Sequence, residues 1–445
     1  MNDRRSRPQP KAPVLEELRN AARRVQGERG LRDLMSHCKR LLSERGEANS
    51  VAIARDLVAR FAALPDDQQA VFFERLSHDF SPDPKAVLQS AQAYANEPSV
   101  PNLLRLTRCA EPPRQELLRR INRSPGGTSS IVAMRRALLA RVKKQPALEA
   151  VEADFLHLLS SWFNPGFLQL QRVDWNSPAQ LLEQIIHHEA VHQIDGWDDL
   201  RRRLQPDRRC FAFFHPQLPN EPLIFVEVAL LPEVPAAIAP LIDKASAPLA
   251  PKQFKVAAFY SISNCQPGLK GVSLGNFLIK RVAEELQREL PQLRTFCTLS
   301  PIPGFAAWVR AGAPCEGLTK ARAERLAQTL AALKLRCGDD LAALAGAEAL
   351  RKLDAEATAL LLRLCAFYLG QHSAAPGGDP VARFHLDNGA RLERLSALGD
   401  LSAKGCKQSF GLMVNYLYDL DKVEAHHEKF TQGDVAQSRA IAALL

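Results

Sequence analysis

Residues 254–290 read FKVAAFYSISNCQPGLKGVSLGNFLIKRVAEELQREL, and this stretch decides the fold. Phe254–Ser263 is rich in β-branched and aromatic residues, as strands are, and the loop 264–275 that follows carries three glycines and a proline. Apolar residues then recur every four positions, which predicts a helix: Leu278, Val282, Leu286 and Leu290. Another apolar run, Arg294–Leu299, ends at the two prolines of SPIPGF (300–305). The chain therefore passes from a strand through a glycine loop and a helix into a second strand.

A loop of this kind presents backbone N–H groups and the start of a helix at one point, which is a generic site for phosphate. The sequence lacks both the G-x-G-x-x-G spacing of dinucleotide-binding loops and the G-K-[ST] of P-loops. The loop therefore predicts affinity for a phosphate group without identifying the ligand.

The part of the chain before residue 161 has the spacing of amphipathic helices, for example at 51–63 and 129–142. Proline-containing breakers divide residues 14–160 into six to eight predicted short helices. No catalytic constellation appears among them, so we expect a role in packing or oligomerisation. Residues 1–13 are basic but have no apolar core, which predicts a disordered leader and not a secretory signal.

The pattern changes after Trp-Phe-Asn-Pro-Gly at 162–166. The apolar runs Cys210–Phe214 and Leu223–Leu231, bounded by turn residues, predict strands. Residues 318–371 are rich in Ala and Leu and predict helices, and 389–445 has helical spacing with polar interruptions. Strands are therefore expected mainly between residues 210 and 299.

The formal net charge of +9 indicates an anionic partner, either nucleic acid or a phosphate-bearing cofactor. Aromatic residues make up only 7% and do not alternate with basic ones, so no stacking platform for nucleic acid is indicated. We interpret the charge as a generally basic surface, including the runs Arg201–Arg203 and Arg208–Arg209. Nine scattered cysteines without a C-x-x-C pair predict reduced thiols, and no apolar run has the length of a membrane span.

Residues 188–192 spell HEAVH, which fits the zinc-protease pattern H-E-x-x-H. The longer pattern fails because positions 195 and 198 are both Asp. A third ligand at Glu221 or Glu227 would come from a turn or a strand. We therefore interpret HEAVH as the end of a helix and not as a metal site.

Five phrases occur in the order found in the malonyl-CoA decarboxylase family, which the chain resembles from about Trp162 to Asp419. They are RRCFAFFHPQLPNEPLIFVEVAL (208–230), FYSISNCQPGLKGVSLGNFLIKRVAEELQREL (259–290), TLSPIPGF (298–305), ARFHLDNGA (382–390) and GLMVNYLY (411–418). The resemblance implies an α+β chain, with an all-helical N-terminal domain (14–160) followed by an acyl-CoA N-acyltransferase-like mixed-sheet catalytic domain (161–445).

The resemblance also implies the conversion of malonyl-CoA to acetyl-CoA and CO2, with an enolate held by backbone N–H groups and then protonated. No metal is expected, and no cofactor beyond the coenzyme A moiety of the substrate. His385 matches the family's proton donor, and its hydroxyl partner is Thr298 or Ser300, which share one strand face. Tyr418 matches a tyrosine near the acyl pocket, although a buried structural role is equally open. The expected coenzyme A contacts are Gln266, Gly268, Leu269, Lys270, Gly271, Val272, Gly275 and Asn388.

Two other functions remain open. An acyl-CoA N-acyltransferase would need an acidic pocket for an amine, and a malonyl-CoA-binding regulator would need no proton donor. We expect a homo-oligomer, without a nucleic-acid or membrane partner. The chain ends in Ala-Leu-Leu, unlike the Ser-Lys-Leu peroxisomal signal, and shows no transit peptide, which predicts a bacterial-type cytoplasmic enzyme.

Overall fold

The computed structural model describes residues 12–274, 278–339, 341–375 and 377–445, which form two compact units. The first unit comprises the described part of Met1–Phe167 with Pro216–Pro219 and Gln266–Leu274. The second comprises Leu168–His215, Asn220–Cys265 and the described part of Gly275–Leu445. Of the predicted leader, residues 1–11 lie outside the described residues.

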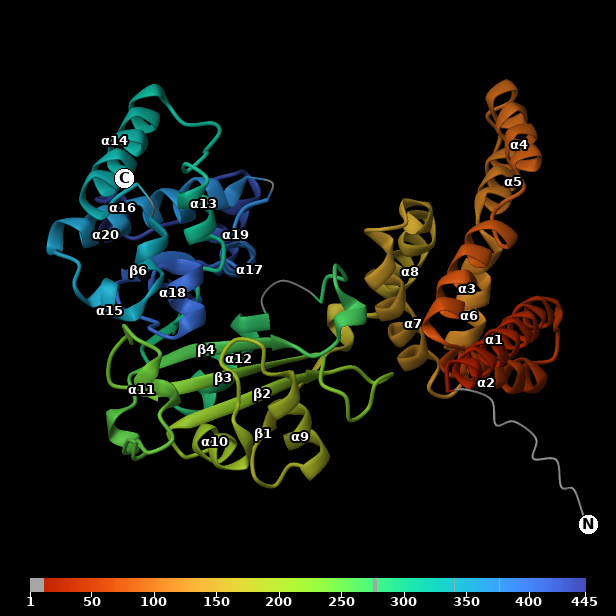
Figure 1. Cartoon of the computed structure of the whole chain (residues 1–445), viewed down its shortest axis with the longest axis horizontal. Coiled ribbons are helices and arrows are strands. Elements are labelled where there is room, and N and C mark those ends of the chain that lie inside the picture. Colours follow the sequence, from red (N-terminus) through yellow and green to blue (C-terminus); the bar gives the residue numbers. More distant parts are fainter. Residues whose placement is uncertain (1–11, 275–277, 340, 376) are drawn as a thin grey trace, which may run out of the picture. The chain divides into compact units, whose positions relative to one another are not determined.

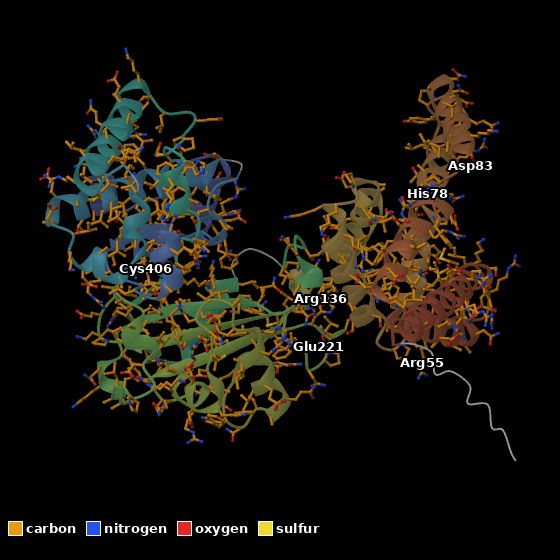
Figure 2. The ribbon with its side chains drawn as sticks, in the orientation of Figure 1. Arg55, His78, Asp83, Arg136, Glu221 and Cys406 are labelled. Atoms are coloured by element: carbon orange, nitrogen blue, oxygen red, sulfur yellow. The ribbon has the colours of Figure 1, made fainter. Side chains whose placement is uncertain are left out.

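The first unit is built from helices, as the spacing in 14–160 predicts (Figure 1). They are α1 (Ala12–Ser43), α2 (Glu47–Ala63), α3 (Asp66–Asp79), α4 (Pro84–Asn96), α5 (Val100–Ala110), α6 (Pro113–Asn122), α7 (Gly127–Val142) and α8 (Glu149–Trp162). Pro84 and Pro113 stand in first turns, where a missing N–H leaves no hydrogen bond unmade. Asp83, labelled in Figure 2, caps α4 by accepting from the N–H of Lys85.

The second unit contains a seven-stranded mixed sheet with the strand order β1-β2-β3-β4-β5-β7-β6. The strands are β1 (Gln169–Val173), β2 (Arg208–Phe214), β3 (Ile224–Leu231), β4 (Val256–Asn264), β5 (Thr295–Thr298), β6 (Arg391–Ser396) and β7 (Met413–Leu417). Only β4 and β5 pair in parallel among these strands, and α12 (Leu278–Glu289) connects them. Because parallel strands run in one direction, the carboxyl ends of β4 and β5 lie at the same edge of the sheet.

Helices surround the sheet in this second unit, and those from α13 onward gather on one side of it (Figure 1). Those before α12 are α9 (Ala179–His188), α10 (Gly196–Arg203) and α11 (Ala239–Ile242). Those after it are α13 (Phe305–Arg310), α14 (Lys320–Cys337), α15 (Ala347–Arg351), α16 (Ala355–Gly370), α17 (Pro380–Asp387), α18 (Ala403–Ser409), α19 (Val423–Thr431) and α20 (Arg439–Ala442). A helical unit followed by a mixed-sheet unit confirms the predicted fold class.

The prediction of helical spacing over 389–445 was wrong in part, because this segment supplies β6 and β7. The strand β7 is buried over most of its length, so its sequence MVNYL shows no alternation of polar and apolar residues. The edge strand β1 was not predicted either, since QLQRV is mostly polar and exposed. Across the described residues, we find no helix with the length and apolar character that a membrane crossing requires.

Candidate active site

Ser300 lies just beyond the carboxyl end of β5 and is held there by backbone hydrogen bonds. Its N–H donates to the carbonyl of Val414 at 2.9 Å, and the N–H of Val414 donates back to Ser300 at 3.0 Å. Pro301 and Pro303 follow, and proline cannot donate to a sheet, so the strand ends at this point. Ser300 is thus fixed by β7 on one side and by a stiff turn on the other.

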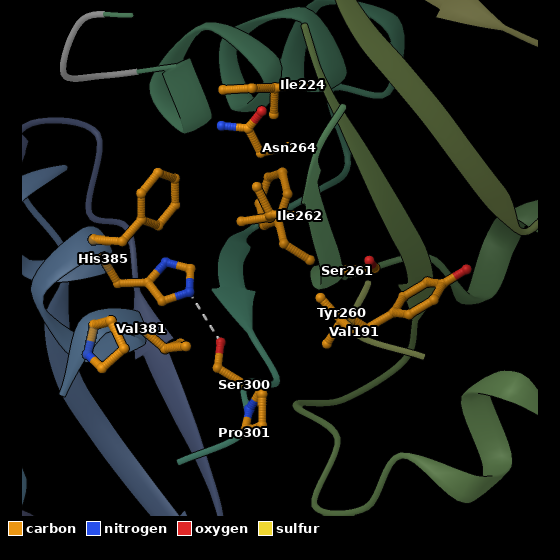
Figure 3. A pocket seen from close by; sticks show the side chains of 13 residues that line it. Val191, Ile224, Tyr260, Ser261, Ile262, Asn264, Ser300, Pro301, Val381 and His385 are labelled. Atoms are coloured by element: carbon orange, nitrogen blue, oxygen red, sulfur yellow. Dashed lines mark hydrogen bonds between the residues drawn. The ribbon is translucent and has the colours of Figure 1, made fainter. Parts of the chain in front are cut away.

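His385 lies in the second turn of α17 and is 3% exposed. Its Nε2 lies 3.0 Å from the hydroxyl of Ser300, and its Nδ1 lies 2.9 Å from the hydroxyl of Tyr418 (Figure 3 shows the first). The imidazole also stacks on the ring of Tyr416, with centroids 4.6 Å apart. The ring is therefore held by a contact at each nitrogen and by one on its face.

Thr298 completes this hydrogen-bonded chain from behind Ser300. Its Oγ1 accepts from the hydroxyl of Ser300 at 2.9 Å and from the backbone N–H of Tyr416 at 3.1 Å. Since Ser300 donates to Thr298, a lone pair of Ser300 is available to the Nε2–H of His385, and Nδ1 then accepts from Tyr418. The structure brings all four predicted catalytic residues together, with Ser300 as the hydroxyl that contacts the imidazole.

Burial governs the protonation of this cluster. It lowers the pKa of His385 from 6.5 to about 3, because the charged imidazolium would lose its hydration. Burial also raises the pKa of Tyr418 well above 10. At neutral pH, the resting cluster therefore holds a neutral imidazole between two neutral hydroxyls.

A pocket of about 270 Å³ opens onto Ser300 and His385 (Figure 3). Its wall is lined by Val191, Ile224, Phe259, Tyr260, Ser261, Ile262, Asn264, Pro301, Pro380, Val381 and Phe384. Most of these side chains are apolar, so charges that enter the pocket are weakly screened. The pocket lies at the edge of the sheet where the carboxyl ends of β4 and β5 meet.

The HEAVH segment adds to the wall of this pocket. Helix α9 ends at His188, which confirms the interpretation as a helix end. The carboxylate of Glu189 accepts from the N–H groups of Val191 and His192 at 2.9 and 2.8 Å, and from the hydroxyl of Ser261 at 2.7 Å. Over the described ranges, no three His, Cys, Asp or Glu side chains gather as a metal site.

Sequence reasoning missed Glu189 as a neighbour of the pocket. The contact joins residues 72 positions apart, from a helix end to β4, and no local pattern reports it. The interpretation of Arg201–Arg203 and Arg208–Arg209 as surface charge was also wrong for four of the five residues, because only Arg201 is exposed. Arg203 is the most deeply buried of them. It is 1% exposed, pairs with Asp199 and Glu227, and donates to the carbonyl of His192. Arg203 is buried because it pairs with two buried carboxylates, which would otherwise lack a counter-ion.

The predicted phosphate loop belongs to the first unit, where it packs on α7. A Cβ on Gly268 would lie 2.1 Å from the carbonyl oxygen of Val132, and Arg135 donates to the carbonyl of Gly268 at 2.8 Å. Leu269 and Val272 are buried, whereas Lys270 and Gly271 are exposed. Close packing on α7 therefore accounts for the glycine at 268.

The remaining predicted coenzyme A contacts are placed as follows. Gly275 lies outside the described residues, and Gln266 begins the turn that leads into Pro267–Leu269. Asn388 is buried, and its side-chain amide donates to the carbonyl of Phe384 at 2.8 Å, which holds the last turn of α17. Their contacts with coenzyme A stay predictions.

Comparison with known proteins extends the resemblance over both units. The family model described as the malonyl-CoA decarboxylase C-terminal domain matches residues 166–445, and that of the N-terminal domain matches 80–163. The mouse (Mus musculus) protein named malonyl-CoA decarboxylase, mitochondrial, is 35% identical over 414 residues, which cover 86% of this chain and 82% of the mouse protein.

Solved structures give the same result. The malonyl-CoA decarboxylase of Rhodopseudomonas palustris is 47% identical with a TM-score of 0.81, covering 93% of this chain and 99% of that one. The malonyl-CoA decarboxylase of Agrobacterium vitis is 46% identical with a TM-score of 0.80, over the same shares of 93% and 99%. The similarity thus includes the segments that carry Ser300, His385 and Tyr418.

Proposed function

This chain belongs to the malonyl-CoA decarboxylase family, and we propose that it converts malonyl-CoA to acetyl-CoA and CO2 at the pocket where Ser300 and His385 meet. The observation that carries the assignment of this pocket is the chain of contacts from Thr298 through Ser300 and His385 to Tyr418. It places a hydroxyl and an imidazole side by side at an apolar wall. A malonyl group needs both, one to hold a carboxylate and one to supply a proton.

In the proposed reaction, the bond between the malonyl Cα and its carboxylate breaks, and CO2 leaves. The electron pair passes into the thioester as an enolate, whose oxygen is held by backbone N–H groups. When the substrate binds, the hydroxyl of Ser300 exchanges its hydrogen bond to Thr298 for one to the carboxylate, and it holds the carboxylate out of the plane of the thioester. His385 then gives a proton to Cα, so each turnover consumes one proton.

That proton must come from solvent, because His385 is neutral in the resting protein. Charging an imidazole with a pKa of about 3 at pH 7 costs roughly 5 kcal/mol. A unit negative charge about 4 Å away returns roughly 4 kcal/mol at an effective dielectric constant of about 20. The negative charge of the malonyl carboxylate, and then of the enolate, therefore offsets most of the cost of charging His385. We propose that His385 takes up its proton from solvent when the substrate binds.

We further propose that turnover requires no metal ion and no cofactor apart from the coenzyme A moiety of the substrate. The chemistry supports this, since an apolar pocket and neutral donors can stabilise an enolate without a Lewis acid. Dialysis against a chelator should leave kcat unchanged. A loss that added zinc restores would contradict the proposal and reopen the question of HEAVH.

The test of function is to incubate the purified protein with malonyl-CoA and follow acetyl-CoA by chromatography. We expect acetyl-CoA and CO2 in equal amounts without an added amine. Acyl transfer that occurs only with an amine would support an N-acyltransferase instead. Tight binding of malonyl-CoA without turnover would support a regulator.

We propose that the protein is a cytoplasmic homo-oligomer that assembles through its helical unit. Helix α5 has no buried residue, and Val100, Leu103 and Leu104 are 71%, 43% and 49% exposed. Light scattering of the wild type and of Leu103→Glu should differ in mass, and a monomeric wild type would refute the assembly. The mouse relative is named mitochondrial, and fractionation of cells that contain this protein tests the proposed cytoplasmic location, which a mitochondrial fraction would refute.

A further inference from the structure

We propose that Asp379 is a positioning residue that aligns Ser300 with His385, an inference that rests on the proposed function of that pair. Asp379 is 1% exposed and precedes α17 as its N-cap. Its Oδ1 accepts from the N–H groups of Val381 and Ala382, both at 3.0 Å. Its Oδ2 accepts from the N–H of Gly304 at 3.2 Å. One carboxylate therefore joins the helix that carries His385 to the turn that follows Ser300.

The two attachment points are close to the pair along the chain and are stiffly connected to it. Val381 is one helical turn before His385, so a shift of the first turn moves the imidazole. Gly304 is four residues after Ser300, and the segment between them contains Pro301 and Pro303, whose φ angles are fixed. A displacement at either attachment point is therefore passed on to the contact between Ser300 and His385.

A carboxylate is required here because four donors converge on its two oxygens. The fourth is the hydroxyl of Tyr368 on α16, which donates to Oδ2 at 3.2 Å. Among the described residues, all four hydrogen-bond donors to the carboxylate are neutral, and burial raises the pKa of Asp379. An asparagine would cap the helix as well as an aspartate does, but it would turn an NH2 group toward Gly304. Oδ2 of Asp379 therefore does not cap the helix but accepts from Gly304 and Tyr368.

There is little room for the turn to shift without losing this contact. A Cβ on Gly304 would lie 2.1 Å from the hydroxyl of Tyr368 and 3.5 Å from Oδ2 of Asp379. The turn after Ser300 is therefore packed directly against the carboxylate, and a change at Oδ2 must move it.

The test compares Asp379→Asn and Asp379→Ser with the wild type, because both replacements keep a capping oxygen and remove the link to Gly304. We expect kcat for malonyl-CoA to fall by about 10- to 100-fold, with KM changed by less than about twofold, since the substrate groups are misaligned but not removed. Asp83→Asn is the matched control, because Asp83 also caps a helix with its carboxylate and lies in the helical unit. It should retain the wild-type kcat.

Two further measurements separate positioning from general destabilisation. In a crystal structure of Asp379→Asn, we expect the distance from Ser300 Oγ to His385 Nε2 to exceed the present 3.0 Å. In a Ser300→Ala background, the same replacement should lower the residual rate less than it does alone, because the alignment is already lost. If Asp379→Asn does not fold, Asp379→Ser is used in both measurements.

A wild-type kcat in the folded variants, or an unchanged Ser300–His385 distance, would overturn the inference while leaving the proposed function standing. An equal loss of rate in both backgrounds would also overturn it, since Asp379 would then act on the fold alone. If the wild-type protein itself forms no acetyl-CoA, the proposed function fails first.

Discussion

Replacing His385 with asparagine removes the imidazole that contacts Ser300 on one side and Tyr418 on the other. Loss of a general acid typically lowers a rate by about 100- to 10,000-fold, and we expect kcat to fall within that range. The shorter amide can reach only one of the two hydroxyls, which leaves one buried hydrogen bond unmade at about 1–3 kcal/mol. Since domains are stable by roughly 5–15 kcal/mol, the variant should still fold.

The assay follows acetyl-CoA formed from malonyl-CoA in a single turnover, and calorimetry measures the affinity for acetyl-CoA. His426→Asn is the matched control, because His426 is also buried and its Nδ1 lies 3.3 Å from the backbone carbonyl oxygen of Gly389. We expect the control to keep its kcat and both variants to bind acetyl-CoA nearly as the wild type does.

A folded His385→Asn protein with wild-type kcat would remove this residue from the mechanism. A loss of acetyl-CoA affinity as large as the loss of rate would instead assign it to binding. Only a fall in kcat at nearly constant affinity agrees with a proton donor, because the proton is needed after the ligand is bound.

Between pH 6.5 and about 3, the unfolded chain binds a proton that buried His385 does not, so the free energy of unfolding should fall as the pH falls through this range. In urea titrations, the free energy of unfolding of His385→Asn should fall less with decreasing pH than that of the wild type. An equal fall would contradict the statement that burial lowers the pKa of His385. Glu189→Gln removes a carboxylate oxygen that orders the pocket wall, so KM for malonyl-CoA should rise. An unchanged KM would show that this carboxylate does not affect substrate binding in the pocket. Gly268→Ala places a Cβ 2.1 Å from a carbonyl of α7 and should lower stability by about 1–3 kcal/mol in thermal melts. Gly346→Ala, with nothing within 4 Å of the added Cβ, is its control, and equal melting points would refute the packing argument.

The sequence predicted the strands that are buried along nearly their whole length and bounded by turn residues. Cys210–Phe214 and Leu223–Leu231 differ from the observed β2 and β3 by at most two residues at an end. The strand β6 was not predicted, because RLERLS is only partly buried and its polar and apolar residues do not alternate with a period of two. Tertiary pairing with β7, and not local propensity, makes this segment a strand.

The residues of the site likewise divide into those that the sequence predicted and those that only tertiary contacts reveal. His385, Ser300, Thr298 and Tyr418 lie in phrases that the family resemblance marks, and the structure gathers them. Asp379 and Glu189 were not predicted as neighbours of the site, although both are carboxylates next to helix ends. Their partners are 75 and 72 residues away, and contacts at such separations are not encoded in any local pattern.

The register of β5 against β7 explains why the pair can form at all. Cys297 faces Leu417 and Ser300 faces Val414, so Thr298 falls opposite Tyr416. Opposite residues of an antiparallel pair share a face, as do alternate residues of one strand. Ser300, Thr298 and Tyr416 therefore lie on one face, and Tyr418, directly after the end of β7, continues the alternation. A slip of one residue would turn either the two hydroxyls or the two tyrosines away from His385. The backbone pairing of β5 with β7 thus sets the relative positions of these hydroxyls and tyrosines.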